Sequence, residues 1–146
     1  MNAQDMWKQF TKTHRVQSNR YQAWAFGGEA PDQLADLVLH GEKTATASAY
    51  DLYQIEKEPL PQVGEYSIIL NSHDEAMCIV QTTKTSVVPF CEVTQQHAFK
   101  EGEGDKSLSY WRDVHEKFFT EELQEVGLYF DENMLVLCEE FQVVYQ

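Results

Sequence analysis

Two strand-like runs separated by a short polar segment constrain the fold of this chain more than any other feature of the sequence. Residues 66–70 are rich in aromatic and β-branched side chains, residues 71–75 are polar, and residues 76–83 form a second apolar run. This order is typical of an antiparallel hairpin. Residues 85–88 extend the predicted sheet as far as Pro89.

Helical patterns flank this strand-rich region instead of alternating with it. They are predicted at residues 2–18, 31–40, 49–57 and 91–100, and over a longer stretch that begins at Asp105 or Ser107. A last strand over residues 135–145, with a polar interruption at Glu139 and Glu140, closes the chain. Strands and helices that do not alternate favour an α+β fold over a parallel βαβ sheet. We therefore expect one domain over residues 1–146, a small and mostly antiparallel β-barrel of about five to six strands flanked by helices.

The charge balance limits the ligands that the protein can bind. The chain has 24 acidic and 11 basic residues, a formal net charge of −13. A protein that holds nucleic acid along its backbone uses lysine and arginine to displace counterions, so we expect no binding of extended duplex nucleic acid. A few cations in a cleft act over about 8–10 Å at physiological salt, so a local pocket can still hold a nucleoside or a short single strand.

The sequence also predicts a cytoplasmic protein without a membrane anchor. No apolar run approaches the length of about 18 residues that a membrane helix needs, and the N-terminus lacks the basic and apolar regions of a signal peptide. The cysteines, Cys78, Cys91 and Cys138, are odd in number and widely spaced. This usage disfavours a disulfide framework or a structural zinc site and fits a reducing compartment.

The segment that follows the second predicted helix carries the first candidate catalytic residues. Gly41 ends that helix, and Lys43 and Thr46 follow in a stretch rich in hydroxyl groups. A threonine hydroxyl is a weak nucleophile until a base takes its proton, and a lysine can be that base if burial lowers its pKa. A lysine that keeps its charge can instead hold a phosphate or an oxyanion. The alternative without function is a solvated Lys43 beside ordinary strand residues.

A second polar segment lies far downstream, where Glu101, Glu103 and Asp105 alternate with glycines. Such acids can form a solvated loop, cap the following helix, bind Mg²⁺ or Mn²⁺, or orient Lys43 and transfer protons. His97 lies four residues before Glu101, so the two share one helical face if the helix continues that far. We expect this segment and the lysine segment to meet in one pocket.

Aromatic residues supply further candidates for ligand binding. Trp24 and Phe26 precede a glycine pair and form either a strand edge or an aromatic wall beside a cleft. Trp111 and His115 lie on the apolar stripe of the longest predicted helix, where a histidine is ordinarily a core residue with one satisfied nitrogen. The residues that we expect to contact a ligand are Trp24, Phe26, Thr44, Ser48, Glu103, Asp105, Trp111 and His115.

Together, several segments resemble the bacterial ASCH-domain proteins, and the resemblance covers nearly the whole chain. The matching segments are residues 24–27, 37–46, 60–66, 89–93, 97–105 and 110–115. The GxKxxT pattern within residues 41–46 is weak alone, but its combination with EGEGD and YWRxxH is specific to the longer, single-domain members. The resemblance implies a PUA-like fold, a cleft that holds the GxKxxT segment, and an association with RNA binding, processing or modification.

The resemblance also implies roles for particular residues. A smaller bacterial member hydrolyses the amide of N4-acetylcytidine with a lysine, a threonine and a glutamate, which match Lys43, Thr46 and Glu101 here. This chain departs from that member in its length, its N-terminal helices and its EGEGD segment, so its substrate and reaction can differ. Another ASCH protein is described as a metal-stimulated ribonuclease.

The leading hypothesis is therefore an amidohydrolase of an N4-acylated, cytidine-like nucleoside that needs no cofactor. Thr46 attacks the amide carbonyl, Lys43 takes the proton of Thr46, and Glu101 orients Lys43 or passes a proton to the leaving amine. One alternative is a ribonuclease that uses Glu101, Glu103 or Asp105 with a divalent metal ion. The other is a non-catalytic module that binds RNA or a nucleotide. The expected partner is a modified nucleoside or a short single-stranded RNA.

Overall fold

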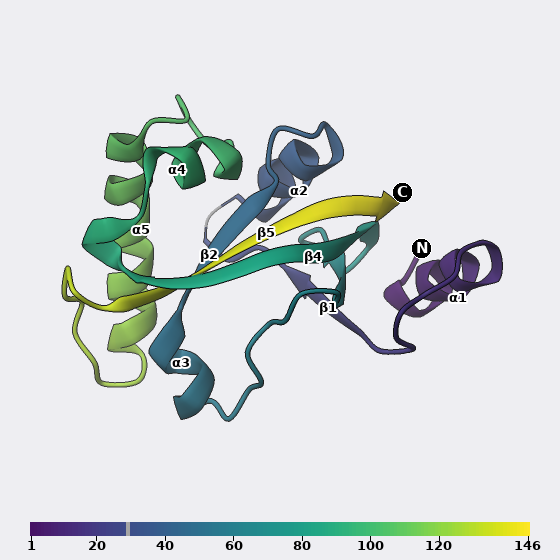
Figure 1. Cartoon of the computed structure of the whole chain (residues 1–146), viewed down its shortest axis with the longest axis horizontal. Helices are drawn as coiled ribbons and strands as arrows, with labels where there is room; N and C mark the ends of the chain where they lie inside the picture. Colours follow the sequence, from purple (N-terminus) through teal and green to yellow (C-terminus); the bar gives the residue numbers. More distant parts are fainter. Residues whose placement is uncertain (29) are drawn as a thin grey trace.

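A curled five-stranded sheet forms the centre of the computed structural model, which describes residues 1–28 and 30–146 (Figure 1). Its strands lie in the order β1 (Tyr21–Ala25), β3 (Tyr66–Leu70), β4 (Ala76–Pro89), β5 (Leu135–Tyr145) and β2 (Ala45–Ala49). β1 pairs with β3 in parallel, and the other neighbours are antiparallel. The predicted α+β fold is confirmed, with a half-barrel sheet in which the described parts of β1 and β2 each have one neighbour.

The β3–β4 hairpin forms because its apolar residues are buried on both faces of the sheet. Ile68 pairs with Ile79, and both side chains are fully buried. The strand predicted at residues 76–83 and the predicted extension of the sheet over residues 85–88 form one continuous strand, β4. A register shift just after Thr82 accommodates the irregular part of the sequence without ending the strand.

The polar pair Glu139 and Glu140 does not interrupt the last strand, contrary to the prediction. β5 is continuous because it pairs with a strand on each side, and Glu139 lies opposite Thr46 of β2. Successive side chains of a strand point to opposite faces. Glu139 is accordingly buried, whereas Glu140 is partly exposed and forms an ion pair with Lys100 at 2.8 Å.

Helix α1 (Ala3–Thr13) covers one end of the sheet with an apolar face. Asn2 caps its first turn, since the Asn2 side chain accepts a hydrogen bond from Asp5 N at 2.8 Å. The prediction of a helix over residues 2–18 is too long. The helix ends at Thr13 because the polar residues that follow offer no further apolar face, and His14 is already extended.

Helices α2 (Pro31–Leu39) and α3 (Tyr50–Ile55) lie on either side of β2 in the chain (Figure 1). Gly41, with φ of +76°, ends α2 as predicted. After this turn the Lys43 N–H donates to Leu37 O at 3.1 Å. The turn leads the chain from α2 into β2 and places the lysine at the entrance to the strand.

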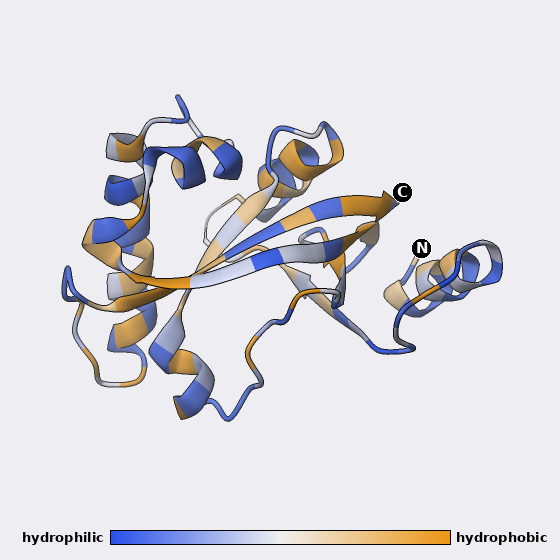
Figure 2. Ribbon diagram, viewed as in Figure 1, coloured by the Kyte–Doolittle hydropathy of each residue, from blue (hydrophilic) through white to orange (hydrophobic). Residues whose placement is uncertain are grey.

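The helix predicted at residues 91–100 is two elements, a 3-10 turn η1 (Phe90–Glu92) and helix α4 (Gln95–Glu101). Helix α5 (Leu108–Gln124) begins after Ser107, whose hydroxyl accepts from Tyr110 N at 3.0 Å. Hydrophobic and hydrophilic residues alternate along α1 and α5, as expected for helices with one buried face (Figure 2). Within the described residues, no helix is long and apolar enough to cross a membrane.

Candidate functional site

A cavity of about 1000 Å³ lies on one face of the sheet, between the two outer strands. Residues of β1, the segment after it, α2, β2, β3, β5 and α5 line this cavity. Consecutive residues of both outer strands border it, residues 22–25 of β1 and residues 46–48 of β2, so backbone as well as side chains forms its wall.

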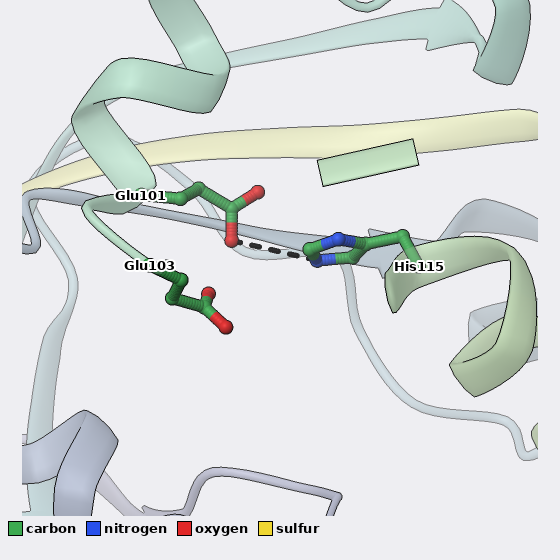
Figure 3. A group of neighbouring side chains, drawn as sticks. All are labelled: Glu101, Glu103 and His115. Atoms are coloured by element: carbon green, nitrogen blue, oxygen red, sulfur yellow. Dashed lines mark ion pairs between the residues drawn. The ribbon is translucent and has the colours of Figure 1, made fainter. Parts of the chain in front are cut away.

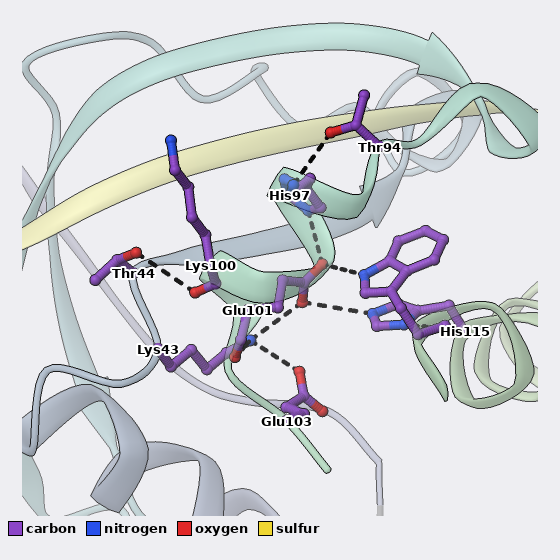
Figure 4. A network of polar contacts seen from close by, with 9 residues as sticks. Lys43, Thr44, Thr94, His97, Lys100, Glu101, Glu103 and His115 are labelled. Atoms are coloured by element: carbon purple, nitrogen blue, oxygen red, sulfur yellow. Dashed lines mark hydrogen bonds and ion pairs between the residues drawn. The ribbon is translucent and has the colours of Figure 1, made fainter. Parts of the chain in front are cut away.

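Lys43 is the charged centre of this cavity. Its side chain is almost fully buried, and its Nζ donates to Glu101 Oε1 at 3.1 Å and to Glu103 Oε2 at 2.9 Å (Figure 4). Nζ also lies 5.2 Å from the centre of the Phe26 ring. Burial opposes the charge of Lys43, but the two carboxylates outweigh burial and raise its pKa. Lys43 is therefore an ammonium ion in the resting protein.

Glu101, the last residue of α4, is the acceptor around which the other polar groups gather. Its Oε1 accepts from Lys43, and its Oε2 accepts from Trp111 Nε1 and lies 2.7 Å from His97 Nε2. Burial would raise the pKa of Glu101, but the Lys43 charge and hydrogen bonds from His115 and His97 lower it well below the ordinary value of 4.5. The predicted sharing of one helical face by His97 and Glu101 is confirmed by this contact.

Two histidines support the carboxylate from opposite sides. Burial disfavours the charge of His97, but contacts with Cys138 and Glu101 raise its pKa to about 9. His115 stacks on the Trp111 ring with centroids 4.1 Å apart, and its Nδ1 bonds to Trp111 O at 2.9 Å. The His115 Nε2 is 3.5 Å from Glu101 Oε1, and contacts with Glu101 raise the pKa of His115 although burial opposes this.

A close backbone approach brings the two predicted segments together. Gly102, which follows α4, has φ of +71°, and a Cβ added there would lie 2.2 Å from Glu42 O. Beside this contact, Thr44 N donates to Lys100 O at 2.7 Å. The lysine segment and the acidic segment therefore meet, as their chemistry predicted.

The predicted site residues divide into two groups in the structure. Lining the cavity are Trp24, Phe26, Lys43, Thr46, Ser48, Glu101, Glu103 and His115. Lys43 and Thr46 share the cavity lining, but within the described residues no hydrogen bond joins the Thr46 hydroxyl to Lys43.

Three predicted ligand contacts, Thr44, Asp105 and Trp111, lie outside the cavity lining. The Thr44 hydroxyl turns towards Lys100 O, 3.4 Å away. Asp105 is exposed, and its Oδ1 accepts from Ser107 N at 2.9 Å beside the start of α5. Trp111 is buried in the core, where it holds Glu101 instead of bordering the cavity.

Sequence reasoning missed two polar residues of the sheet that also line the cavity, Glu139 and Ser67. Both are buried, and Glu139 Oε2 accepts from the Thr82 hydroxyl at 2.6 Å. Burial raises the pKa of Glu139, and the Thr82 hydrogen bond opposes this. A charged residue within an otherwise apolar strand was the available signal, but it was interpreted as a break in the strand.

Glu101, Glu103 and His115 offer ligand atoms that lie within 4.8 Å of one another, a spacing that suits a metal ion (Figure 3). However, the ammonium of Lys43 already binds Glu101 Oε1 and Glu103 Oε2. A divalent cation would have to displace Lys43 or accept its repulsion at close range. The donor set therefore fits a metal poorly while Lys43 is charged.

A curled sheet with flanking helices and a polar cavity at its outer strands is a PUA-like fold, the type found in RNA-binding domains. The model of the ASCH domain family matches residues 22–145, and the chain belongs to this family.

Solved structures agree with this membership. The crystal structure of an ASCH domain from Lactobacillus crispatus JV V101 is 34% identical, covers 98% of this chain and 94% of its own, and has a TM-score of 0.93. A protein from Enterococcus faecalis V583 is 36% identical, with 99% of this chain and 88% of its own covered and a TM-score of 0.91. No curated protein that was compared with the chain matches it.

Proposed function

We propose that the protein hydrolyses the amide of an N4-acylated, cytidine-like nucleoside in this cavity. The observation that carries the proposal is a buried ammonium, Lys43, held between two glutamates in a cavity wall that it shares with Thr46. Amide hydrolysis needs a nucleophile, a group that stabilises the oxyanion, and a proton donor for the leaving nitrogen. The cavity holds a candidate for each.

The charge state of Lys43 changes the role that the sequence suggested for it. A raised pKa makes Lys43 a proton donor and oxyanion partner in the resting protein instead of the base. In the proposed reaction Thr46 Oγ1 attacks the amide carbonyl carbon, and its proton passes to Glu103. The C–N bond then breaks, and Lys43 gives a proton to the leaving N4 atom. Glu103, whose Oε2 lies 2.9 Å from Nζ, returns a proton to Lys43.

Water completes the cycle by attacking the acyl ester on Thr46. The water gives one proton to the Glu103 carboxylate, Glu103 passes that proton to the Thr46 oxygen as the ester C–O bond breaks, and the acid is released. Glu101 takes no proton in this scheme. Its hydrogen bonds to His97 and Trp111 fix its position, so it holds Lys43 in place.

The negative charge of the cavity lining favours an uncharged ligand. Its lining includes only two lysines, Lys43 and Lys117, within the described residues. It also includes the glutamates Glu58, Glu65, Glu101, Glu103, Glu121, Glu122 and Glu139. This excess of acid repels phosphate groups and favours a nucleoside over an oligonucleotide. Trp24 lines the cavity and is our candidate to stack on a base, a contact worth about 1–3 kcal/mol in proteins that bind single strands.

The test uses N4-acetylcytidine and chromatographic detection of cytidine. We expect the wild-type protein to release cytidine, Thr46→Val to lose at least about 10³-fold in kcat because it removes the nucleophile, and Thr46→Ser to keep measurable turnover. The two variants differ in the hydroxyl while both preserve a small side chain. Absence of turnover by the pure protein, or equal rates for Thr46→Val and wild type, would refute the proposal.

The convergence of Glu101, Glu103 and His115 favours one second candidate, a metal-dependent ribonuclease. In that case Mg²⁺ or Mn²⁺ would stimulate cleavage of a short RNA, and a chelator would abolish it. We expect the opposite pattern, with chelator-insensitive hydrolysis of the nucleoside and no cleavage of RNA. Binding of a nucleoside without any turnover would identify a non-catalytic module.

A further inference from the structure

We propose that Glu139 and Ser67 form a second subsite on the sheet, which binds hydrogen-bond donors of a nucleoside and selects it over its 5′-phosphate. The inference rests on the proposed function only in taking the ligand to be a nucleoside. It needs no amide hydrolysis, and it uses residues that the proposed reaction does not.

The sheet register places Glu139 directly beside the proposed nucleophile. Glu139 of β5 is the pairing partner of Thr46 of β2. Residues directly opposite on antiparallel strands have side chains on one face, with Cβ atoms roughly 4.5–5.5 Å apart. If the carbonyl group of a ligand reaches Thr46, the neighbouring polar groups of that ligand therefore come close to Glu139.

Ser67 presents an unused polar group to the same cavity. Its side chain is 7% exposed and lines the cavity. Across residues 1–28 and 30–146, its hydroxyl makes no hydrogen bond. Nevertheless, no fully buried side-chain oxygen or nitrogen in this part of the chain lacks a partner. The Ser67 hydroxyl must therefore reach the open space of the cavity.

The same reasoning applies to one oxygen of Glu139. Glu139 is 9% exposed, and its Oε2 is occupied by the Thr82 hydroxyl. Within the part of the chain that the structure describes, its Oε1 has no hydrogen-bond partner, so it too must face the cavity. The sheet thus offers one carboxyl oxygen and one hydroxyl that have no partner among the described residues.

The spacing and chemistry of these two groups indicate the ligand. Ser67 pairs with Val80 of β4, and Thr82, whose hydroxyl binds the Glu139 carboxylate, lies two residues further along β4. One strand spacing and two residues along a strand separate the Ser67 and Thr82 positions, roughly 8 Å. A single acyl group cannot span that distance, but a base joined to its sugar can. A carboxyl oxygen accepts from the N–H and O–H groups of such a ligand, and a serine hydroxyl can donate or accept. Glu65, which also lines the cavity, adds negative charge near Ser67 and disfavours a phosphate there.

The test compares binding of cytidine and of cytidine 5′-monophosphate by calorimetry, using wild type and three variants. We expect wild type to bind cytidine at least about tenfold more tightly, because like charges at close range are strongly unfavourable. Glu139→Gln should weaken cytidine binding and reduce this preference severalfold. Ser67→Ala should weaken cytidine binding without loss of stability, because its hydroxyl bonds to no described residue.

The matched control is Glu140→Gln, the same charge change at the next residue, which lies outside the cavity lining and binds Lys100 instead. It should leave both affinities unchanged. The proposal is overturned if Glu139→Gln and Glu140→Gln behave alike while Ser67→Ala equals wild type, if wild type binds both compounds equally, or if it binds neither.

The outcomes also separate this subsite from the proposed reaction. Selective binding of cytidine without hydrolysis of N4-acetylcytidine would remove the reaction and leave the subsite standing. Hydrolysis of N4-acetylcytidine and its 5′-phosphate with equal kcat/KM would leave the reaction standing and remove the subsite.

Discussion

Lys43 illustrates how a charge can be buried in a small domain. Its ammonium has lost its water and gained two carboxylates and a carbonyl oxygen in exchange. An ion pair of this kind contributes little net stability, since the cost of desolvation offsets the attraction. Its removal is nevertheless costly, because the carboxylates would remain buried and face each other without a cation.

We predict that Lys43→Met destabilises the protein by about 3–5 kcal/mol, as expected when one partner of a buried ion pair is removed. Urea denaturation followed by circular dichroism measures the free energy of unfolding. Lys84→Met is the control, because the Lys84 side chain is 68% exposed and its contact with Glu140 is 3.9 Å long. An unfolding free energy that is equal in wild type and Lys43→Met would contradict the ammonium assignment.

The charged residues around Lys43 and Glu101 also determine how stability should depend on pH. The pKa of His97 is raised from 6.5 to about 9, so its stabilising contribution is complete below pH 6.5 and is lost as the pH rises through 9. We expect the unfolding free energy of wild type to fall over this range, and the decline to be smaller in His97→Gln. Urea denaturation at pH values from 6 to 10 provides the measurement. Parallel curves for the two proteins would rule out the His97 contribution.

The ionisation of Glu101 determines how we expect the unfolding free energy to change at acidic pH. Its pKa is lowered well below 4.5, so its contribution is present above pH 4.5 and is lost as the pH falls through the lowered value. Glu101→Gln should therefore have a lower unfolding free energy than wild type near neutral pH, and the difference should shrink as acid is added. A difference that stays constant down to pH 2 would argue against an ionised Glu101.

Residue chemistry was partly predictable from the sequence. The contact between Lys43 and Glu101 could be predicted, because each residue lies in a recognisable polar segment and the two segments were expected to share one pocket. The protonation state of Lys43 could not, since it depends on the second carboxylate, Glu103, and on the depth of burial. The interior position of Glu139 depends on which strand lies opposite, a relation that local sequence does not contain.

At the level of elements, the turn after α4 joins the two halves of the site. Gly102 and Gly41 both adopt positive φ, but their surroundings differ. A Cβ at Gly102 would collide with backbone at Glu42, whereas a Cβ at Gly41 meets nothing within 4 Å. The positive φ alone costs any other residue roughly 1–2 kcal/mol.

We therefore predict that Gly102→Ala is much more destabilising than Gly41→Ala, which should cost only about 1–2 kcal/mol. The first change forces α4 away from Lys43, so it should also reduce any turnover of N4-acetylcytidine. Thermal unfolding of both variants measures the difference. Equal melting temperatures would mean that the two segments need no close contact.

Elements with local patterns were predicted well, and those that depend on distant pairing were not. The β3–β4 hairpin forms from residues adjacent in sequence, and its pattern showed it. The parallel pairing of β1 with β3 joins residues such as Tyr21 and Tyr66, and no short stretch of sequence encodes such a contact.

For the whole molecule, the net charge of −13 and the acidic cavity lead to one expectation about nucleic acid. We predict no measurable binding of a long single-stranded RNA at physiological salt. A protein that grips phosphates would instead bind it with an affinity that falls steeply with salt, with a slope of about −0.7 per phosphate neutralised. A fluorescence-anisotropy titration with a labelled oligonucleotide at two salt concentrations distinguishes these cases. Tight, salt-sensitive binding would restore the RNA-binding alternative.

The position of the two outer strands has a consequence for solubility. An exposed strand edge is a template for pairing with another chain, and proteins commonly cover such edges or place charges on them. Here β1 and β2 both border the acidic cavity, whose glutamates repel a second copy of this negatively charged chain. We therefore expect the carboxylates that line the cavity also to oppose edge-to-edge pairing of two copies of the chain.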